Sequence, residues 1–287
     1  MEKTEYSGWR KLRPHRPNIK PSTPPKDPSQ IAYPVKDSVV PTKFFDRLSF
    51  IGDLFVGCFV VETTEGIIQI DCMWPDDRCV EMIEEGYRKL GLDINDLKMI
   101  LVTHGHDDHF GKGAYFREKY GCKIYMSEVD YKLASTDGPH QHFQPMQYRP
   151  DGFISDGERI RLGDVEIIAV STPGHSPGCL SYIIPVEDEG RKHKAALWGG
   201  TGIPKEPEMR EKYLESVKRF SDICDKEQVD VEISTHPFVD CGLERMAICR
   251  DIVDGVANPF VIGKEAYKRY EQMFYDLCLD AIERDKA

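Results

Sequence analysis

Apolar positions along the chain predict strands first and then strands that alternate with helices. Residues 54–72 contain two apolar runs separated by a turn at 64–66, which predicts a pair of joined strands. In residues 74–92, apolar side chains recur on one helical face, with Pro75 at the start and Gly91 at the end. A strand followed by a helix is therefore expected before residue 93.

The later segments continue this alternation. Strands are expected at 97–102, 123–126, 159–162, 165–172, 179–186, 195–200 and 229–234, and helices at 114–120, from Ser127, at 208–226 and over most of the C-terminal remainder. A polar turn is expected at 187–194, and residues 135–152 read as a long irregular loop of the kind that often serves as a lid. Two halves of similar length predict an α/β sandwich with sheets inside and helices outside.

The N-terminal segment has a different composition. Residues 11–35 are rich in Pro, Lys and Ser, which favours an extended arm over the domain or a partner, and a disordered leader fits the same composition. We therefore divide the chain into an arm at 1–40 and a domain at 41–287. The arm suggests a homo-oligomer.

Charge and composition narrow the function. The 287 residues carry 49 acidic against 38 basic side chains, a net charge of −11, which argues against nucleic acid as the main ligand. The sequence shows no apolar run of signal-peptide or bilayer length, so no membrane contact is expected. Nine cysteines without a C-x-x-C pair indicate reduced thiols. The cytoplasm is the expected location, and a small molecule is the expected partner.

The stretch "HGHDDH" at residues 104–109 concentrates potential metal ligands. His104 and His106 leave an extended chain on the same side, and Asp108 and His109 follow where the chain turns toward a helix. Imidazole and carboxylate together suit Zn²⁺ best, with Fe or Mn as alternatives.

Two further histidines follow apolar strands. His175 lies in "TPGHSPG" and His236 in "ISTHPF", each just past a predicted strand. A single histidine there is usually a surface or capping residue, but all of these together indicate a metal site at one edge of the sheets.

These motifs resemble the metallo-β-lactamase superfamily, with H-x-H-x-D-H as its signature, "TPGHSPG" around the next ligand and Asp71 in "IIQIDC" before the first helix. The resemblance runs from about Ile51 to the C-terminus and implies the four-layer αβ/βα sandwich. Residues 198–204, "WGGTGIP", lack the bridging carboxylate of most relatives, so the third subclass (B3) is the most similar. The C-terminal "ANPFVIGKEAYKRY" also resembles that subclass.

The resemblance implies a two-zinc centre. By it, the first zinc is held by His104, His106 and His175, and the second by Asp108, His109 and His236. It also implies a di-zinc hydrolase in which a metal-bound hydroxide, oriented by Asp108 as the catalytic residue, attacks a cyclic amide, lactone or ester. Weak β-lactamase activity is compatible with this expectation. Alternatives are a phosphodiesterase, a glyoxalase II-like thioester hydrolase or a di-iron oxidoreductase.

Substrate contacts are expected from residues near these motifs. The candidates are Trp74, His140, His142, Phe143, Tyr148, Gly200 and Thr201. The competing interpretation of residues 135–152 is a packed surface loop, and that of Trp74 is a position in the core. B3 lactamases tend to have serines where this chain has Gly200 and Gly202, which argues against penicillin hydrolysis as the native activity.

Overall fold

The computed structural model describes residue 1 and residues 38–138, 141–251 and 256–286. Most of the predicted arm and the candidate substrate residue His140 lie outside the described residues. The division of the chain at residue 40 therefore stays a prediction. None of the described helices is long and apolar enough to cross a bilayer.

The first sheet has seven strands in sequence order, antiparallel from β1 to β4 and parallel from β4 to β7. Its strands are β1 (Thr42–Phe45), β2 (Leu48–Gly52), β3 (Gly57–Thr63), β4 (Gly66–Ile70), β5 (Leu97–Leu101), β6 (Lys123–Met126) and β7 (Gly152–Phe153). The predicted pair in residues 54–72 is confirmed as β3 and β4.

The second sheet has five strands in the order β12-β11-β10-β9-β8. They are β8 (Arg159–Leu162), β9 (Val165–Ser171), β10 (Leu180–Asp188), β11 (Arg191–Leu197) and β12 (Val231–Ile233). The helices are α1 (Asp77–Leu90), α2 (Asp107–Phe110), α3 (Gly113–Tyr120), α4 (Glu128–Ala134), α5 (Pro207–Glu227), α6 (Gly242–Arg250) and α7 (Lys264–Asp285), with a 3₁₀ turn, η4, at Ile94–Asp96.

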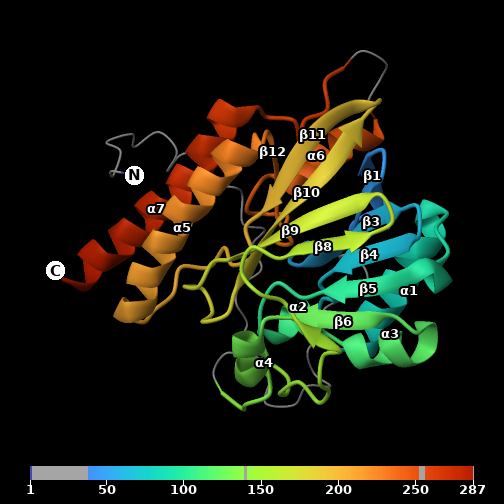
Figure 1. The fold of residues 1–287 in the computed structure, drawn as a ribbon, viewed down its shortest axis with the longest axis horizontal. Coiled ribbons are helices and arrows are strands. Elements are labelled where there is room, and N and C mark those ends of the chain that lie inside the picture. The colour runs from blue at the N-terminus through green and yellow to red at the C-terminus, as the bar shows by residue number, and fades with distance from the viewer. Residues whose placement is uncertain (2–37, 139–140, 252–255, 287) are drawn as a thin grey trace.

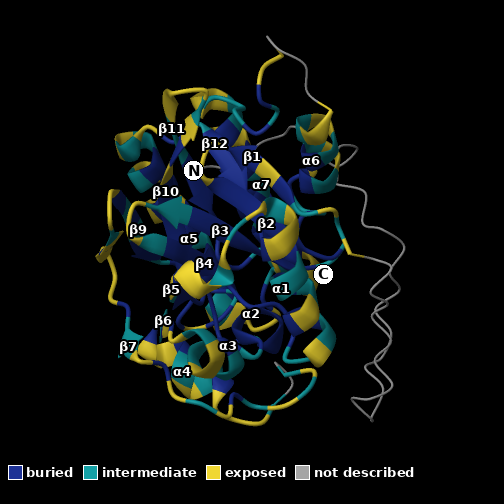
Figure 2. Ribbon diagram, turned by 90° about the vertical axis from the view of Figure 1, so that its right-hand side faces the viewer, coloured by how far each residue is buried: buried dark blue, intermediate teal, exposed yellow. Residues whose placement is uncertain are grey.

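Three apolar cores make the molecule four layers thick. The central core lies between the sheets and contains Phe50 and Tyr182. A second core joins α1 and α3 to the first sheet, and a third, around Trp198, joins α5 and α7 to the second sheet. Figure 1 shows α5 and α7 on one side of the strands and α1 and α3 on the other, and Figure 2 shows that much of the strand ribbon is buried. The predicted αβ/βα sandwich is confirmed.

The polar turn is shorter than the expected range 187–194. The strands β10 and β11 continue through this segment, and only Glu189 and Gly190 form the turn, with φ of 50° and 77°. Both residues in the left-handed region are typical of a two-residue hairpin. Opposite charges face each other across the two strands next to this turn, as in the pair of Glu187 with Lys192. This end of the hairpin has little contact with the core, so its strands lack an apolar repeat.

Helix α1 begins two residues later than Pro75 suggested. Asp76 is the N-cap, and its carboxylate accepts hydrogen bonds from the backbone N–H groups of Arg78 (2.7 Å) and Cys79 (3.3 Å). Such a cap satisfies N–H groups that have no partner within the helix. The predicted end is confirmed, because Gly91 adopts a left-handed conformation with φ of 73°.

Candidate metal centre

Loops that follow four strands bring the predicted ligands together. Asp71 follows β4, residues 102–109 follow β5, His175 follows β9 and His236 follows β12. Because the two sheets pack face to face, these loops meet although they are far apart in sequence.

The first predicted ligand set forms a compact cluster. The ligand atoms of His104, His106 and His175 all lie within 4.8 Å of one another. The Nε2 atom of His104 is buried and has no hydrogen-bond partner among the described residues. A buried polar atom without a partner costs free energy unless something binds it. A metal ion among these three imidazoles fits that atom.

The second predicted set also converges. Nε2 of His109 lies 3.2 Å from Nε2 of His236. An oxygen of Asp108, Oδ2, lies 3.6 Å from the first of these nitrogens and 3.8 Å from the second. The ligand atoms of His104, Asp108 and His109 are also within 4.8 Å of one another, so the two sets adjoin. The residues present fit a pair of metal ions.

Contacts behind the imidazoles direct their Nε2 atoms inward. The Nδ1 atom of His109 lies 2.7 Å from Oδ2 of Asp71, that of His236 lies 2.8 Å from the carbonyl of Phe55, and that of His175 lies 2.8 Å from the carbonyl of Gly202. Each acceptor places the imidazole proton on Nδ1 and leaves Nε2 unprotonated, with its lone pair facing the cluster. Metal-binding histidines have outer partners of this kind.

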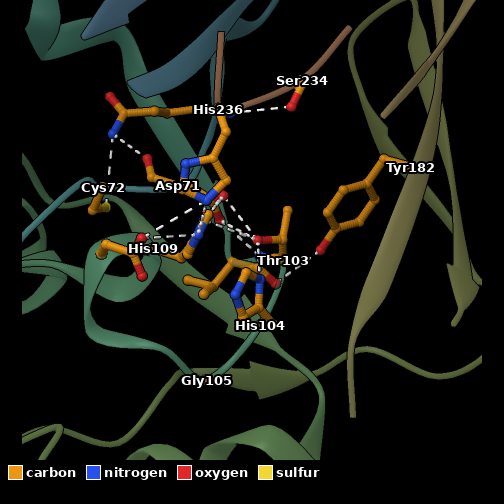
Figure 3. A network of polar contacts seen from close by, with 12 residues as sticks. Asp71, Cys72, Thr103, His104, Gly105, His109, Tyr182, Ser234 and His236 are labelled. Atoms are coloured by element: carbon orange, nitrogen blue, oxygen red, sulfur yellow. Dashed lines mark hydrogen bonds and ion pairs between the residues drawn. The ribbon is translucent and has the colours of Figure 1, made fainter. Parts of the chain in front are cut away.

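Asp71 connects the β4 and β5 loops beneath the cluster. Its side chain is fully buried and accepts hydrogen bonds from the backbone N–H (2.7 Å) and the hydroxyl (2.8 Å) of Thr103, as well as from His109. Figure 3 shows Asp71 and Thr103 surrounded by His104, His109 and His236. Asp71 has φ of 66°, an uncommon conformation for a residue other than glycine, which is consistent with a functional position.

Burial and neighbouring groups set the protonation of the cluster. Burial, together with the adjacent imidazoles, holds the pKa of His104 well below its ordinary value, and burial lowers the pKa of His175 to about 4. Burial opposes protonation of His109 too, but the nearby carboxylates of Asp108 and Asp71 raise its pKa. Burial raises the pKa of Asp108. His104 and His175 are therefore neutral at pH 7, the form that binds metal.

Aromatic side chains form a wall beside the second set. The Trp74 ring is 2% exposed, and its centroid lies 5.9 Å from Phe55, 5.6 Å from Phe143 and 5.3 Å from His142. The ring of Phe55 also lies 5.1 Å from that of His236. Trp74 is thus a buried support of this wall, whereas His142 is exposed.

Other candidate substrate residues lie close to the cluster in different ways. The hydroxyl of Tyr148 donates a hydrogen bond to the carbonyl of Phe110 (2.8 Å), which fixes the long loop to α2. A methyl group added to Gly200 would lie 2.3 Å from Cβ of His175, so this glycine gives that ligand room. Thr201 is half-buried beside it. Their contacts with substrate stay predictions.

Asp107 is a residue that sequence reasoning missed. Its buried carboxylate accepts hydrogen bonds from the backbone N–H groups of His142 (2.5 Å) and Phe143 (2.6 Å) and lies 3.2 Å from Nδ1 of His142. It fastens the long loop to the ligand motif. The only signal in the sequence is an acid at the second variable position of H-x-H-x-D-H.

The architecture defines a class of protein, an αβ/βα sandwich with a histidine and aspartate cluster at the ends of its strands. The family model described as the metallo-beta-lactamase superfamily matches residues 51–188. Over this stretch, the chain is similar to the metallo-β-lactamase superfamily.

Solved structures share this fold over nearly the whole chain. BJP-1, a subclass B3 metallo-β-lactamase of Bradyrhizobium japonicum, is 25% identical with a TM-score of 0.75, and the match covers 86% of this chain and 95% of that one. LRA-12, a class B3 di-zinc metallo-β-lactamase from an Alaskan soil metagenome, is 19% identical with a TM-score of 0.70, over 86% and 96% of the two chains. The expected likeness to subclass B3 is confirmed.

Curated relatives match over a shorter stretch. A hydroxyacylglutathione hydrolase, GloC, of Haemophilus influenzae is 31% identical over 113 residues, which are 37% of this chain and 50% of that protein. The matches to this and two other relatives span between 50% and 62% of their lengths. By their names, this relative is a hydrolase and the two solved structures above are β-lactamases.

Proposed function

We propose that this protein is a di-zinc hydrolase that opens a cyclic amide, a lactone or an ester in a small molecule. The observation that carries the proposal is the convergence of two ligand sets around the unpartnered Nε2 of His104. Metal ions bound there supply Lewis acidity that polarises a carbonyl group and acidifies water.

The roles of the ligands follow from their surroundings. His104, His106 and His175 would hold the first zinc, and the set formed by Asp108, His109 and His236 would hold the second. Asp71 keeps His109 in the tautomer that presents Nε2. These ligands supply only one carboxylate, so the loaded centre keeps positive charge and favours a substrate rich in carbonyl groups.

The remaining residues act on the substrate and on water. Asp108 has a second carboxylate oxygen that can accept a hydrogen bond from the attacking water and orient it. The aromatic wall that includes Phe55 and Phe143 excludes water and offers an apolar surface to the substrate. His142, exposed next to Trp74, is positioned to contact the substrate's outer part.

A second candidate is hydrolysis of a glutathione-type thioester. It is favoured by the likeness to the hydroxyacylglutathione hydrolase. Residues 198–204, which have no carboxylate, argue for the lactone, amide or ester over the thioester. The same loop, with glycines against His175, argues against penicillins as the native substrate.

A metal assay combined with a substrate screen tests the proposal. We expect purified protein to contain two zinc ions per chain and to hydrolyse at least one lactone, lactam or ester, and we expect a chelator to abolish the activity and zinc to restore it. H175Q should lose the first zinc and the activity. The matched control H193Q changes a histidine of β11 that is hydrogen-bonded to Asp230 (2.6 Å). This variant should keep its zinc and its activity.

Several outcomes would contradict the proposal. Two iron ions with a visible absorption band would indicate an oxidoreductase instead. Zinc-dependent cleavage of thioesters or phosphodiesters alone would replace the substrate class. Protein that binds no divalent metal at neutral pH would overturn the proposal as a whole.

A further inference from the structure

We propose that Asp130 is a positioning residue that joins the two loops carrying the first ligand set, an inference that rests on the proposed function. Asp130 lies in α4, outside the ligand motifs, and its side chain is fully buried. It would preorganise the site before metal binds.

The carboxylate of Asp130 receives three hydrogen bonds from these loops. Oδ2 accepts from the backbone N–H of Gly105 (2.8 Å) and from the hydroxyl of Ser176 (2.5 Å). Oδ1 accepts from the backbone N–H of Gly178 (2.6 Å). All three partners are donors, so an acceptor-only carboxylate suits the position.

The partners of Asp130 are neighbours of the ligands in sequence. Gly105 lies between His104 and His106, and Ser176 directly follows His175. One side chain therefore contacts the backbone on both sides of the gap that the first metal would fill. Outer partners that orient ligands in this way commonly have a strong effect on metal affinity.

Close backbone packing supports the same interpretation. A methyl group added to Gly105 would lie 2.6 Å from the Asp130 carbonyl oxygen, and one added to Gly178 would lie 2.6 Å from the Asp130 nitrogen. At both glycines the loop backbone lies close to the backbone of α4. The two glycines let both loops press directly against the helix.

The sequence assigns Asp130 a different role. Ser127 and Asp130 have capping-box spacing, in which the acid would reach back to the start of the helix. Half of that pattern is present, because the Ser127 hydroxyl accepts from the Asp130 backbone N–H (3.1 Å). The carboxylate instead turns toward the ligand loops.

The described contacts make the effect selective for the first metal. In the second set, His109 is held by Asp71 and His236 by the Phe55 carbonyl, not by Asp130. Loss of Asp130 should therefore weaken the first zinc and leave the second much less affected.

The test measures zinc affinity with one site at a time. In an H236A background, which removes the second site, we expect D130N to weaken the remaining zinc by about 10–100-fold in competition with a chromophoric chelator. In an H175Q background, which removes the first site, D130N should leave the affinity within a few-fold. Asn keeps one acceptor oxygen and replaces the other with an NH₂ group, so at least one backbone N–H, that of Gly105 or that of Gly178, would face a donor instead of an acceptor.

Two further variants control for folding. E128Q makes the same change at an exposed acid of α4 that pairs with Lys132 (3.0 Å) and should leave zinc affinity unchanged. If D130N does not fold, S176A is the substitute. It removes one contact of Asp130 and should weaken the first zinc by several-fold.

The outcomes separate the two proposals. If D130N, or S176A in its place, lowers the melting temperature of the metal-free and zinc-loaded protein equally and leaves zinc affinity unchanged, Asp130 is only structural and the inference is overturned. A wild-type protein that takes up no zinc would refute the proposed function, and the role of Asp130 would fall with it.

Discussion

Replacing Asp71 with asparagine should uncouple the ligand His109 from the fold. The carboxylate of Asp71 accepts two hydrogen bonds from Thr103 and one from His109. In D71N, the amide oxygen can still accept from the Thr103 backbone N–H, but an NH₂ group then faces Nδ1 of His109. His109 would have to move its proton to Nε2, the atom 3.2 Å from Nε2 of His236.

The magnitude follows from the contacts that are lost. The Thr103 hydroxyl can rotate and accept from the new NH₂ group, and His109 can accept from it in the changed tautomer, so the loss is that of the buried negative charge that strengthened these hydrogen bonds. Hydrogen bonds to charged groups contribute about 1.5–3 kcal/mol, so the free energy of unfolding should fall by about 2 kcal/mol. A protonated Nε2 cannot bind metal, and the affinity for the second zinc should fall by roughly 10–100-fold.

Urea denaturation of the metal-free protein and a zinc count after dialysis measure the two effects. D164N is the control, because Asp164 also accepts a backbone N–H but lies exposed beside Arg47. It should leave the free energy of unfolding nearly unchanged, because solvent screens an exposed ion pair. D71N protein that keeps both zinc ions and unchanged stability would refute the tautomer argument.

Two other predictions concern the core and the pH dependence. Helix propensity favours alanine over Gly86 in α1 by about 1 kcal/mol, but a methyl there would lie 2.4 Å from Cγ2 of Ile51. Overpacking costs about 1–3 kcal/mol, so G86A should show a lower urea midpoint, and a raised midpoint would contradict this account. Burial lowers the pKa of His175 from 6.5 to about 4, so the unfolded chain takes up a proton that the folded chain refuses between these values. Metal-free protein should lose stability as pH falls from about 6.5 to about 4, and H175Q should lose less; equal losses in both would count against it.

Local patterns in the sequence determined the main elements and most of the candidate ligands. Apolar repeats predicted β3, β4 and α1, because side-chain periodicity follows directly from strand and helix geometry. The motif at 104–109 was recognisable because its ligands lie within one short turn. His175 and His236 were candidates because each follows an apolar strand, and the family resemblance then assigned them to the two ligand sets.

Tertiary structure alone decided the features that depend on distant neighbours. The strands within residues 187–194 have no apolar repeat that would predict them. Exposed strands at the end of a hairpin need no such repeat, because each is specified by its pairing partner. In the sequence, Asp107 is only a variable position of the motif and Asp130 only part of a helix cap. Both nevertheless accept hydrogen bonds from loops more than 20 residues away. A side chain's partners across such distances depend on how the sheets pack, and no local pattern encodes that arrangement.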